Sequence, residues 1–335
     1  MKLILVTGAT GFLGKHLVEQ LRRANGSARL RLLCRGVSPW DQDPQIEVIR
    51  GDVMSREVVL RATEGVEEIY HLAGVVSRDP KDQWLLYSTH VGGTRNVCEA
   101  ALKQGTRKIL LVSSSGTIAV SREPTVHDEN SGFKHEIIGE FPYYLSKIYS
   151  EKVALSYFAQ CRLPVVVVNP SLLLGPGDDR NSSTRDVALL LEGQILALPI
   201  GGLNFVDARD VATGLVAAMR SGRPGERYLF GGPNWTFREM ISQLSKIARV
   251  SAPKLQPSLK HQLASARLLR RLYPLMGKSF HLDDASIKMS SLFWYCDSTK
   301  AREELGFEAR DPIATLKETV EDVRHRLRMT SDRNK

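Results

Sequence analysis

The sequence predicts an α/β protein with a doubly wound parallel sheet and a smaller, mostly C-terminal region, and three observations support this fold class. In the first half of the 335 residues, short runs rich in Val, Ile and Leu alternate with helical patterns, as in successive βαβ units. These runs are continuously apolar, which is typical of strands covered on both faces. After residue 170 the alternation weakens, and loops containing Gly and Pro lead into shorter elements.

Strands and helices are expected in a fixed order along the first half. The strands are LILVTG, RLRLLCR, IEVIRGD, VEEIYHLAG, RKILLVSSSG and LPVVVVNPS. One helix follows the first strand from about Phe12 to Ala24, another runs through TRNVCEAALKQG, and a third begins at Tyr143. We expect residues 1–170 to form the domain of the parallel sheet, 203–231 to return to it, and 171–335 to supply the smaller region.

Composition and charge narrow the class of function. An apolar content of 42% and a charged content of 25% are those of an ordinary globular protein, and no window reaches the ~18 apolar residues of a membrane span. The apolar stretch before Thr7 is too short for a signal peptide, so a cytoplasmic protein is expected. The net charge of +9 is dispersed and lacks a nucleic-acid-binding motif, so no nucleic-acid partner is expected. A phosphorylated cofactor or an acidic membrane surface would account for it.

The cysteines show no paired spacing. They lie far apart along the chain, at Cys34, Cys98, Cys161 and Cys296. This distribution predicts neither a metal site nor a disulfide, and buried thiols in a reducing compartment are expected.

A glycine-rich turn joins the first strand to the first helix. Its sequence, TGATGFLG, spaces three glycines three residues apart. Such a turn lets the backbone approach a pyrophosphate closely, and the helix N-terminus adds unpaired N–H groups and a positive dipole end. The alternative is a plain glycine turn. The expected cofactor contacts here are Gly8, Thr10, Gly11, Phe12, Leu13 and Gly14.

The end of the second strand bears on the choice of dinucleotide. Arg35 stands where NAD-binding sheets often carry an acid for the ribose hydroxyls. An arginine can pair with a ribose 2′-phosphate, so NADP(H) is favoured over NAD(H); the alternative is a solvated arginine. Asp52, beside Val53, lies at the end of the third strand. Its carboxylate could accept a hydrogen bond from the adenine amino group, or it could cap the following helix.

The stretch EFPYYLSK, residues 140–147, contains two tyrosines, of which one has catalytic spacing. Tyr143 is the only tyrosine with a lysine four residues later, Lys147. In a helix, residues four apart share a face, whereas Tyr144 points elsewhere. An ammonium beside a phenol lowers the phenol's pKa, so this pair could relay a proton. By itself the pattern is more often a surface feature.

Taken together, the motifs resemble those of the extended short-chain dehydrogenase/reductases, within the NAD-dependent epimerase/dehydratase superfamily. The resemblance runs nearly end to end and rests on TGATGFLG, GD at Gly51, HLAG at His71, GTRN at Gly93, SSS at Ser113, Tyr143-x-x-x-Lys147, NPSLLLGPG at Asn169 and DSTKAREELGF at Asp297. The chain is most similar to the dihydroflavonol-reductase, 3β-hydroxysteroid-dehydrogenase and hopanoid-associated branch. This resemblance implies a Rossmann dinucleotide-binding domain (1–170), a substrate-binding region (171–335) and a Ser/Tyr/Lys active site.

The resemblance also implies roles for single residues. Tyr143 would donate or accept the proton, while Lys147 would lower its pKa and hold the nicotinamide ribose. The family serine that polarises the substrate carbonyl usually stands last in its run, so Ser115 is expected, with Ser114 in reserve. Further cofactor contacts are expected from Leu72, Ala73, Gly74, Asn169 and Pro170, with His71 beside the cofactor.

One position departs from the family pattern. The family usually reads Asn-Val-x-Gly-Thr where this chain has His90-Val91-Gly92-Gly93-Thr94. Any role of that asparagine in ordering the site is therefore open. Either His90 substitutes for it, or His90 is an ordinary helix histidine.

Three functions are compatible with such a site. A reductase would reduce a carbonyl with NADPH, or oxidise the alcohol. A nucleotide-sugar epimerase or dehydratase would keep NAD bound, but the arginine that epimerases usually offer to the substrate diphosphate is missing from residues 203–207, LNFVD. A catalytically silent cofactor-sensing protein would tend to lose Tyr143 or Lys147, and both are present. The reductase is therefore favoured.

The sequence is less specific about contacts with molecules other than the cofactor, and alternatives stay open. Residues 116–141 and 172–203 carry few charges, which favours an apolar or aromatic carbonyl substrate. Residues 258–280 can form a basic amphipathic helix, with Lys260, Arg267 and Arg271 roughly opposite Leu269 and Tyr273. Its apolar face either packs on the core or rests weakly on an anionic membrane. A homodimer is left open.

Overall fold

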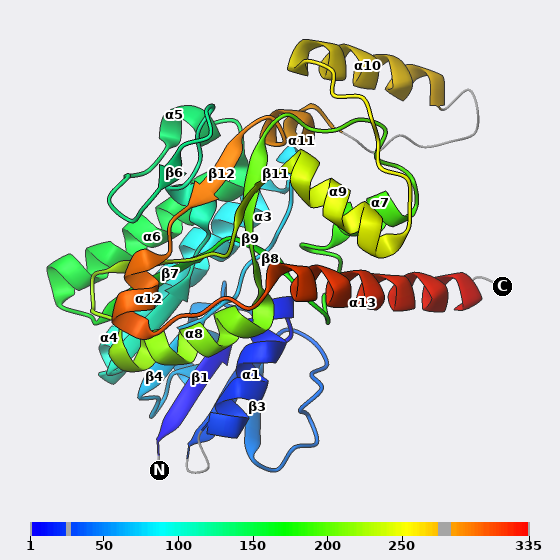
Figure 1. Ribbon diagram of the computed structural model, residues 1–335. Helices are drawn as coiled ribbons and strands as arrows, with labels where there is room; N and C mark the ends of the chain where they lie inside the picture. Colours follow the sequence, from blue (N-terminus) through cyan, green and yellow to red (C-terminus); the bar gives the residue numbers. More distant parts are fainter. Residues whose placement is uncertain (1, 25–27, 274–282, 334–335) are drawn as a thin grey trace.

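The computed structural model describes residues 2–24, 28–273 and 283–333 (Figure 1). Its main sheet has seven strands in the order β10-β7-β5-β4-β1-β2-β3, and every neighbouring pair is parallel. The strands are β1 (Leu3–Thr7), β2 (Arg29–Cys34), β3 (Ile46–Arg50), β4 (Glu68–His71), β5 (Lys108–Val112), β7 (Val165–Pro170) and β10 (Arg227–Phe230). The predicted fold class and all six predicted strands are confirmed.

Helices cover both faces of this sheet, which explains the continuously apolar strands. One layer contains α1 (Phe12–Ala24), α8 (Ala208–Ser221) and α12 (Thr299–Leu305), and the other contains α2 (Arg56–Ala62), α4 (Gly93–Gln104) and α6 (Pro142–Cys161). Within β7, Val166 and Val168 pack toward the first layer while Val165 and Val167 pack toward the second. Because successive side chains point to opposite faces, a strand between two layers is apolar at every position.

A second, smaller sheet carries β11-β9-β12-β6, with β8 paired to β9. Its strands are β6 (Val126–His127), β8 (Leu172–Leu174), β9 (Gly202–Asp207), β11 (Asn234–Thr236) and β12 (Phe293–Cys296). The chain therefore crosses between the two sheets several times: β6 belongs to the second sheet, whereas α8 packs on α1 and β10 pairs with β7.

The remaining helices lie mostly in the C-terminal half, and three of them pack on the smaller sheet. They are α7 (Arg185–Leu191), α9 (Phe237–Ala248), α10 (Leu259–Leu272), α11 (Asp284–Met289) and α13 (Pro312–Arg333), while α3 (Gln83–Tyr87) and α5 (His135–Ile138) lie earlier in the chain. Side chains of α7, α9 and α13 share one apolar cluster with β8 and β9. Among the described residues, no helix is long and apolar enough to span a membrane.

Helix α10 lies at the margin of the molecule (Figure 1). Ala266 is its only buried residue, and Leu268 and Leu272 are exposed. Arg267 and Arg270 pair with Asp284 of α11. The amphipathic segment proposed for 258–280 is thus helical up to Leu272, and its last part, 274–280, lies outside the described residues.

The cysteines are free thiols, and three of them are buried: Cys34, Cys98 and Cys296. Cys161 is exposed, so the expectation of burial is wrong for this residue. It is the last residue of α6, where the helix leaves the core.

Candidate active site

The two predicted catalytic residues of α6 lie at the carboxyl end of β5. Pro142 occupies the first turn of the helix, where its missing N–H costs no hydrogen bond. Tyr143 and Lys147 follow one turn apart. Lys147 is 7% exposed, and its Nζ donates to the Val112 carbonyl at 3.1 Å. Because Val112 is the last residue of β5, the ammonium lies beside the start of the serine run at Ser113.

The three serines of this run have different partners. Ser113 Oγ donates to Glu151 Oε1 at 2.5 Å, and Ser114 Oγ accepts from the Gly116 amide at 3.3 Å. Ser115 is buried and begins a short 3-10 turn. Its hydroxyl has no hydrogen-bond partner among the residues that the structure describes, so the protein itself leaves it available to another molecule.

Burial dominates the ionisation of Tyr143. It raises the pKa of this phenol above the ordinary value, and the neighbouring phenol of Tyr144 acts in the same direction. The expected lowering of this pKa is therefore wrong for the protein alone, because desolvation of the phenolate sets the direction of the shift. A phenol in this state is protonated, which suits the donor side of a proton transfer.

Burial also acts on the lysine, in the opposite sense. It lowers the pKa of Lys147 to about 8, and the carboxylate of Glu151 opposes that shift. The ammonium is therefore present at neutral pH and is lost as the pH rises through about 8. Nζ has three N–H groups and uses one on the Val112 carbonyl.

Glu151 is a central residue that the sequence reading missed. Its side chain is fully buried. Oε1 accepts hydrogen bonds from Ser113, Thr117 and Asn169, and Oε2 accepts from Arg227 Nε at 2.8 Å. One carboxylate thus ties α6 to the ends of β5 and β7 and to β10. A signal was available, because Glu151 continues the four-residue spacing of Tyr143 and Lys147.

The glycine-rich turn leaves no room for side chains. Gly8 has φ +76°, and a Cβ there would lie 2.7 Å from the Ala73 amide nitrogen. A Cβ on Gly14 would lie 2.1 Å from the Gly8 carbonyl oxygen. The amide of Gly11 donates back to that same carbonyl at 3.0 Å, and α1 begins at the next residue. The tight turn and open helix N-terminus expected of a pyrophosphate cradle are therefore both present.

The remaining predicted contacts of this turn differ in exposure. Thr10 and Phe12 are half-buried beside Gly11, whereas Leu13 packs its side chain into the main core. Any contact of Leu13 with a cofactor would therefore be made by its backbone.

The segment after β4 runs alongside this turn. The Leu72 amide donates to the Thr7 carbonyl, and the Ala73 amide donates to Thr7 Oγ1 at 3.2 Å. His71 is buried between the hydroxyls of Thr7 and Thr94, and burial lowers its pKa to about 3. Its neutral ring thus ties the ends of β1 and β4 to α4.

Gly74 brings a further histidine close to the catalytic lysine. A Cβ on Gly74 would lie 2.9 Å from His90 Nε2 and 3.5 Å from Lys147 Nζ. His90 is 1% exposed and hydrogen-bonds to the Val75 amide and to Ser146 on α6. His90 is therefore a buried residue that links the segment after β4 to α6.

Arg35 and Asp52 lie together at the ends of β2 and β3. The Arg35 side chain is 58% exposed, and its guanidinium lies 3.8 Å from the Asp52 carboxylate. The N-cap of α2 is Ser55, so the alternative that Asp52 caps this helix is wrong. Val53 is buried, and its carbonyl accepts from Asn96.

Asn169 and Pro170 end β7 next to the serine run. Asn169 Nδ2 donates to the Ser114 carbonyl, to Thr117 Oγ1 and to Glu151. Its Oδ1 is buried and has no partner among the described residues. Orphaned buried polar atoms are rare, so this oxygen is consistent with a ligand at this strand end.

An aromatic wall adjoins the two catalytic candidates. Tyr144 stacks on Trp294 of β12 with ring centroids 4.7 Å apart and 26° between the planes. The Trp294 Nε1 donates to the Met289 carbonyl, which fixes the indole. Gly116, directly after Ser115, packs against both rings. Tyr144 also meets the Tyr143 ring edge to face at 5.1 Å.

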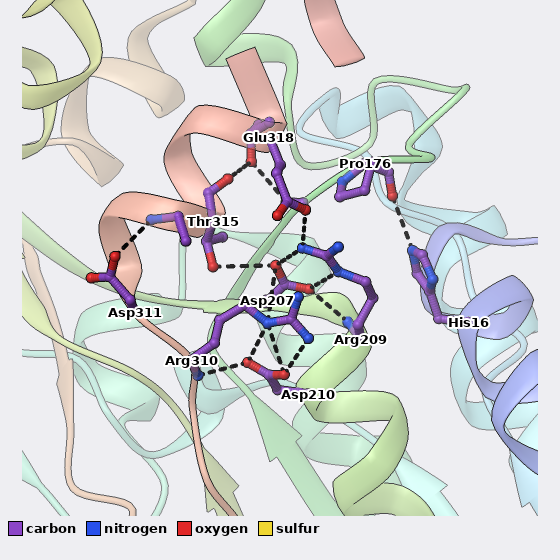
Figure 2. A network of polar contacts seen from close by, with 12 residues as sticks. His16, Pro176, Asp207, Arg209, Asp210, Arg310, Asp311, Thr315 and Glu318 are labelled. Carbon is purple, nitrogen blue, oxygen red and sulfur yellow. Dashed lines mark hydrogen bonds and ion pairs between the residues drawn. The ribbon is translucent and has the colours of Figure 1, made fainter. Parts of the chain in front are cut away.

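The arginines near residues 203–207 are held in ion pairs (Figure 2). Asp207, 2% exposed, caps α8 and binds Arg209 through both carboxylate oxygens. Arg209 also pairs with Glu318, and Arg310 pairs with Asp210. Asn204, within the 203–207 stretch that lacks the epimerase arginine, is buried and donates to the Gly232 carbonyl.

These features fit a nicotinamide dinucleotide. The crowded glycine turn and the N-terminus of α1 suit its pyrophosphate, Lys147 has N–H groups left for a ribose, and Asn169 Oδ1 lacks a partner. When bound, such a group supplies hydride transfer to or from a carbon atom. The Tyr143 phenol and the Ser115 hydroxyl are groups of the kind that can hydrogen-bond to a carbonyl or alcohol oxygen.

Comparisons with known proteins agree with this geometry. The model of the NAD dependent epimerase/dehydratase family matches residues 4–231. A Synechocystis protein provisionally named dihydroflavonol 4-reductase is 32% identical over 328 residues, 96% of this chain and 93% of that relative. Sterol demethylase protein B of Methylococcus capsulatus is 29% identical over 96% of this chain and 98% of its own length.

Solved structures show the same fold. The crystal structure of gox2253 superposes with a TM-score of 0.82 at 29% identity, covering 97% of this chain and 98% of the other. DesIV, a dTDP-glucose 4,6-dehydratase from Streptomyces venezuelae with NAD bound, gives a TM-score of 0.75 at 23% identity over 96% and 97% of the two chains. With its sequence motifs, its parallel sheet and these matches, the chain belongs to the NAD dependent epimerase/dehydratase family, whose extended short-chain dehydrogenase/reductase members are NAD(P)-dependent oxidoreductases.

Proposed function

We propose that the protein is an NADP(H)-dependent reductase that converts a carbonyl group of an apolar or aromatic small molecule into an alcohol. The observation that carries this proposal is the position of the Tyr143 phenol, half-buried one helical turn before Lys147 and edge to face with Tyr144, which stacks on Trp294. Reduction of a carbonyl needs a proton donor at the developing alkoxide, and a neutral phenol is such a donor. The reverse oxidation would use the same residues.

The roles of the chain's residues follow from their positions. Ser115 would donate a hydrogen bond to the carbonyl oxygen, because its hydroxyl has no partner in the described part of the chain. Tyr143 would deliver the proton to that oxygen. The Lys147 ammonium would stabilise the phenolate left behind and bind the nicotinamide ribose through its remaining N–H groups. Hydrogen bonds aimed at the developing charge lower the barrier most.

The preference for NADP(H) rests on Arg35. Its guanidinium is largely exposed and only loosely paired, at 3.8 Å, with Asp52. Such a group can bind a 2′-phosphate without first breaking a strong ion pair. No acid stands beside Arg35 in the sequence to repel that phosphate.

The proposed substrate class rests on the surroundings of Tyr143. The Tyr144–Trp294 stack joins a cluster that includes Val120, Ile138 and Phe141. Relatives are named for apolar or aromatic compounds, among them cinnamoyl-CoA reductase 1 of rice, 27% identical over 95% of this chain. Against a nucleotide-sugar epimerase, Arg209 and Arg310 are held by carboxylates, and residues 203–207 contain no arginine.

Turnover measurements test the proposal. The purified protein is incubated with NADPH or NADH and a panel of aromatic, fused-ring and aliphatic carbonyl compounds, and cofactor oxidation is followed by absorbance. We expect consumption of NADPH with a cyclic or aromatic substrate. Conversion of a nucleotide sugar without net cofactor consumption would contradict the reductase and favour the epimerase.

A further inference from the structure

A π-helical turn interrupts the helical segment that passes the active site. Helix α3 ends at Tyr87, residues Ser88–Gly92 form the π turn, and α4 begins at Gly93. Such turns are rare and occur often at functional sites. His90 lies in the middle of this turn, and its side chain is buried toward α6 rather than turned to solvent.

The hydrogen bonds of His90 admit a single protonation state. The Val75 amide donates to Nε2 at 3.1 Å, so Nε2 carries no proton. Ser146 Oγ donates to the Tyr143 carbonyl at 2.7 Å, so its 2.7 Å contact with His90 Nδ1 requires Nδ1–H as the donor. Burial first, and then the ammonium of Lys147, hold the pKa of His90 well below its ordinary value. The ring is therefore neutral with its proton on Nδ1.

These bonds form a bridge between two parts of the site. One arm reaches Val75, next to the Gly74 backbone that lies between His90 and the catalytic lysine. The other arm reaches the first turn of α6 through Ser146. The His90 ring also packs against the Tyr143 ring, at 5.7 Å between centroids and 80° between planes.

The bridge does not connect to the reacting proton. The Nε2 lone pair is taken by an amide, and the proton of Ser146 goes to the main-chain carbonyl of Tyr143 rather than to its phenol. His90 therefore has neither a free acceptor nor a route to the phenolic oxygen. Its contacts can hold atoms in place, but they cannot relay a proton.

We propose that His90 is a positioning residue that fixes the Gly74–Val75 backbone with one arm and the Tyr143 turn of α6 with the other. The cofactor is expected along the first of these segments, and the proposed proton donor lies on the second, so the inference rests on the proposed function of Tyr143. His90 thereby takes the place of the asparagine usual at this position, with two-armed geometry that a shorter amide cannot reproduce.

Two amide substitutions separate the arms. In His90→Asn the shorter amide can donate from near the Nδ1 position to Ser146 but cannot reach Val75. In His90→Gln the longer amide can place its oxygen near the Nε2 position and accept from Val75 but loses Ser146. Each variant thus keeps one arm, and Ser146→Ala removes the catalytic-helix arm without altering His90. NADPH affinity is measured by titration, and turnover by steady-state kinetics.

We expect opposite effects from the two amides. His90→Gln and Ser146→Ala should lower kcat by roughly tenfold, the effect of one hydrogen bond, with little change in the Kd of NADPH. His90→Asn should weaken NADPH binding by roughly the same factor and keep more of kcat. The matched control is Ser156→Ala on the same helix, because Ser156 Oγ donates to the Val153 carbonyl at 2.7 Å in the same manner but meets no histidine. It should leave both constants unchanged.

Several results would overturn the inference. They are an unchanged kcat in Ser146→Ala, equal losses of kcat and NADPH affinity in both amide variants, or an acid limb near pH 6.5 in the parent that His90→Gln removes. If His90→Gln does not fold, Ser146→Ala still tests the helix arm, because it removes only a hydroxyl. Failure of the proposed function would look different. Tyr143→Phe would then keep full turnover, whereas the Kd of NADPH would still rise in His90→Asn because the hydrogen bond to Val75 is lost.

Discussion

Replacing Glu151 by Gln is expected to destabilise the protein through the loss of one buried charge. The substitution keeps the shape and one acceptor oxygen, so Ser113, Thr117 and Asn169 can keep their hydrogen bonds. It places an amide NH2 against the Arg227 Nε–H, where Oε2 had accepted at 2.8 Å. Removing one partner of a buried ion pair costs about 3–5 kcal/mol. Because the Arg227 side chain is 21% exposed and partly solvated, we expect the free energy of unfolding to fall by a smaller amount, about 2–3 kcal/mol.

Thermal unfolding measures this effect. At about 2 °C per kcal/mol for a chain of this size, the Tm should fall by about 4–6 °C. The double variant Glu151→Gln/Arg227→Met removes both charges and keeps an apolar side chain over Phe133, so most of the loss should be recovered. Glu140→Gln, in the exposed pair with Lys288, is the control and should change the free energy of unfolding by less than about 0.5 kcal/mol.

The same variants test the electrostatics of the active site. The Lys147 ammonium is present below its pKa of about 8 and is lost above it, so kcat/KM for NADPH should fall as the pH rises through that value. Glu151 opposes the lowering of this pKa, so its neutralisation should move the alkaline limb to lower pH in both the single and the double variant. The reasoning would be refuted if Glu151→Gln kept the Tm of the parent. It would also be refuted if the alkaline limb of the kcat/KM profile stayed at the same pH in either variant.

Three further outcomes are expected. Tyr143→Phe should lower turnover by orders of magnitude while NADPH still binds, whereas Tyr144→Phe keeps the ring stack and should be mild; equal losses would reject the assignment. Arg35→Asp should weaken NADPH and narrow or reverse the preference over NADH, and calorimetry showing tighter NADH binding to the parent would contradict it. Sedimentation with anionic vesicles should show at most weak, salt-sensitive association through α10, because Arg267 and Arg270 already pair with Asp284; firm binding at high salt would oppose this.

Much of the site was predictable because its signals are local. The glycine spacing before α1 reflects a turn with φ +76° at Gly8 and no room for a Cβ at Gly14, and both constraints act within a few residues. The four-residue spacing of Tyr143 and Lys147 places them on one helix face whatever surrounds the helix. Apolar runs such as Val165–Val168 identify strands covered on both faces.

Other features depend on segments that are distant in the sequence. The partners of Glu151 stand 18 to 76 residues away, and neither they nor the neutral form of His90 can be read from a short window. The direction of the Tyr143 pKa is the plainest case. Spacing to Lys147 predicted a lowering of this pKa, but burial in the folded protein and the neighbouring Tyr144 phenol raise it.

The sequence by itself therefore determined the strands of the parallel sheet, the glycine-rich turn and the Tyr143–Lys147 pair. Each of these is encoded by residues that are neighbours in the sequence. Only the tertiary structure decided which charges meet and which are buried. Glu151 with Arg227, and Asp207 with Arg310, are ion pairs between residues far apart in the sequence, which the chain brings together after several crossings between the sheets. Desolvation depends on all the atoms around a group, so ionisation follows from the packed fold rather than from local spacing.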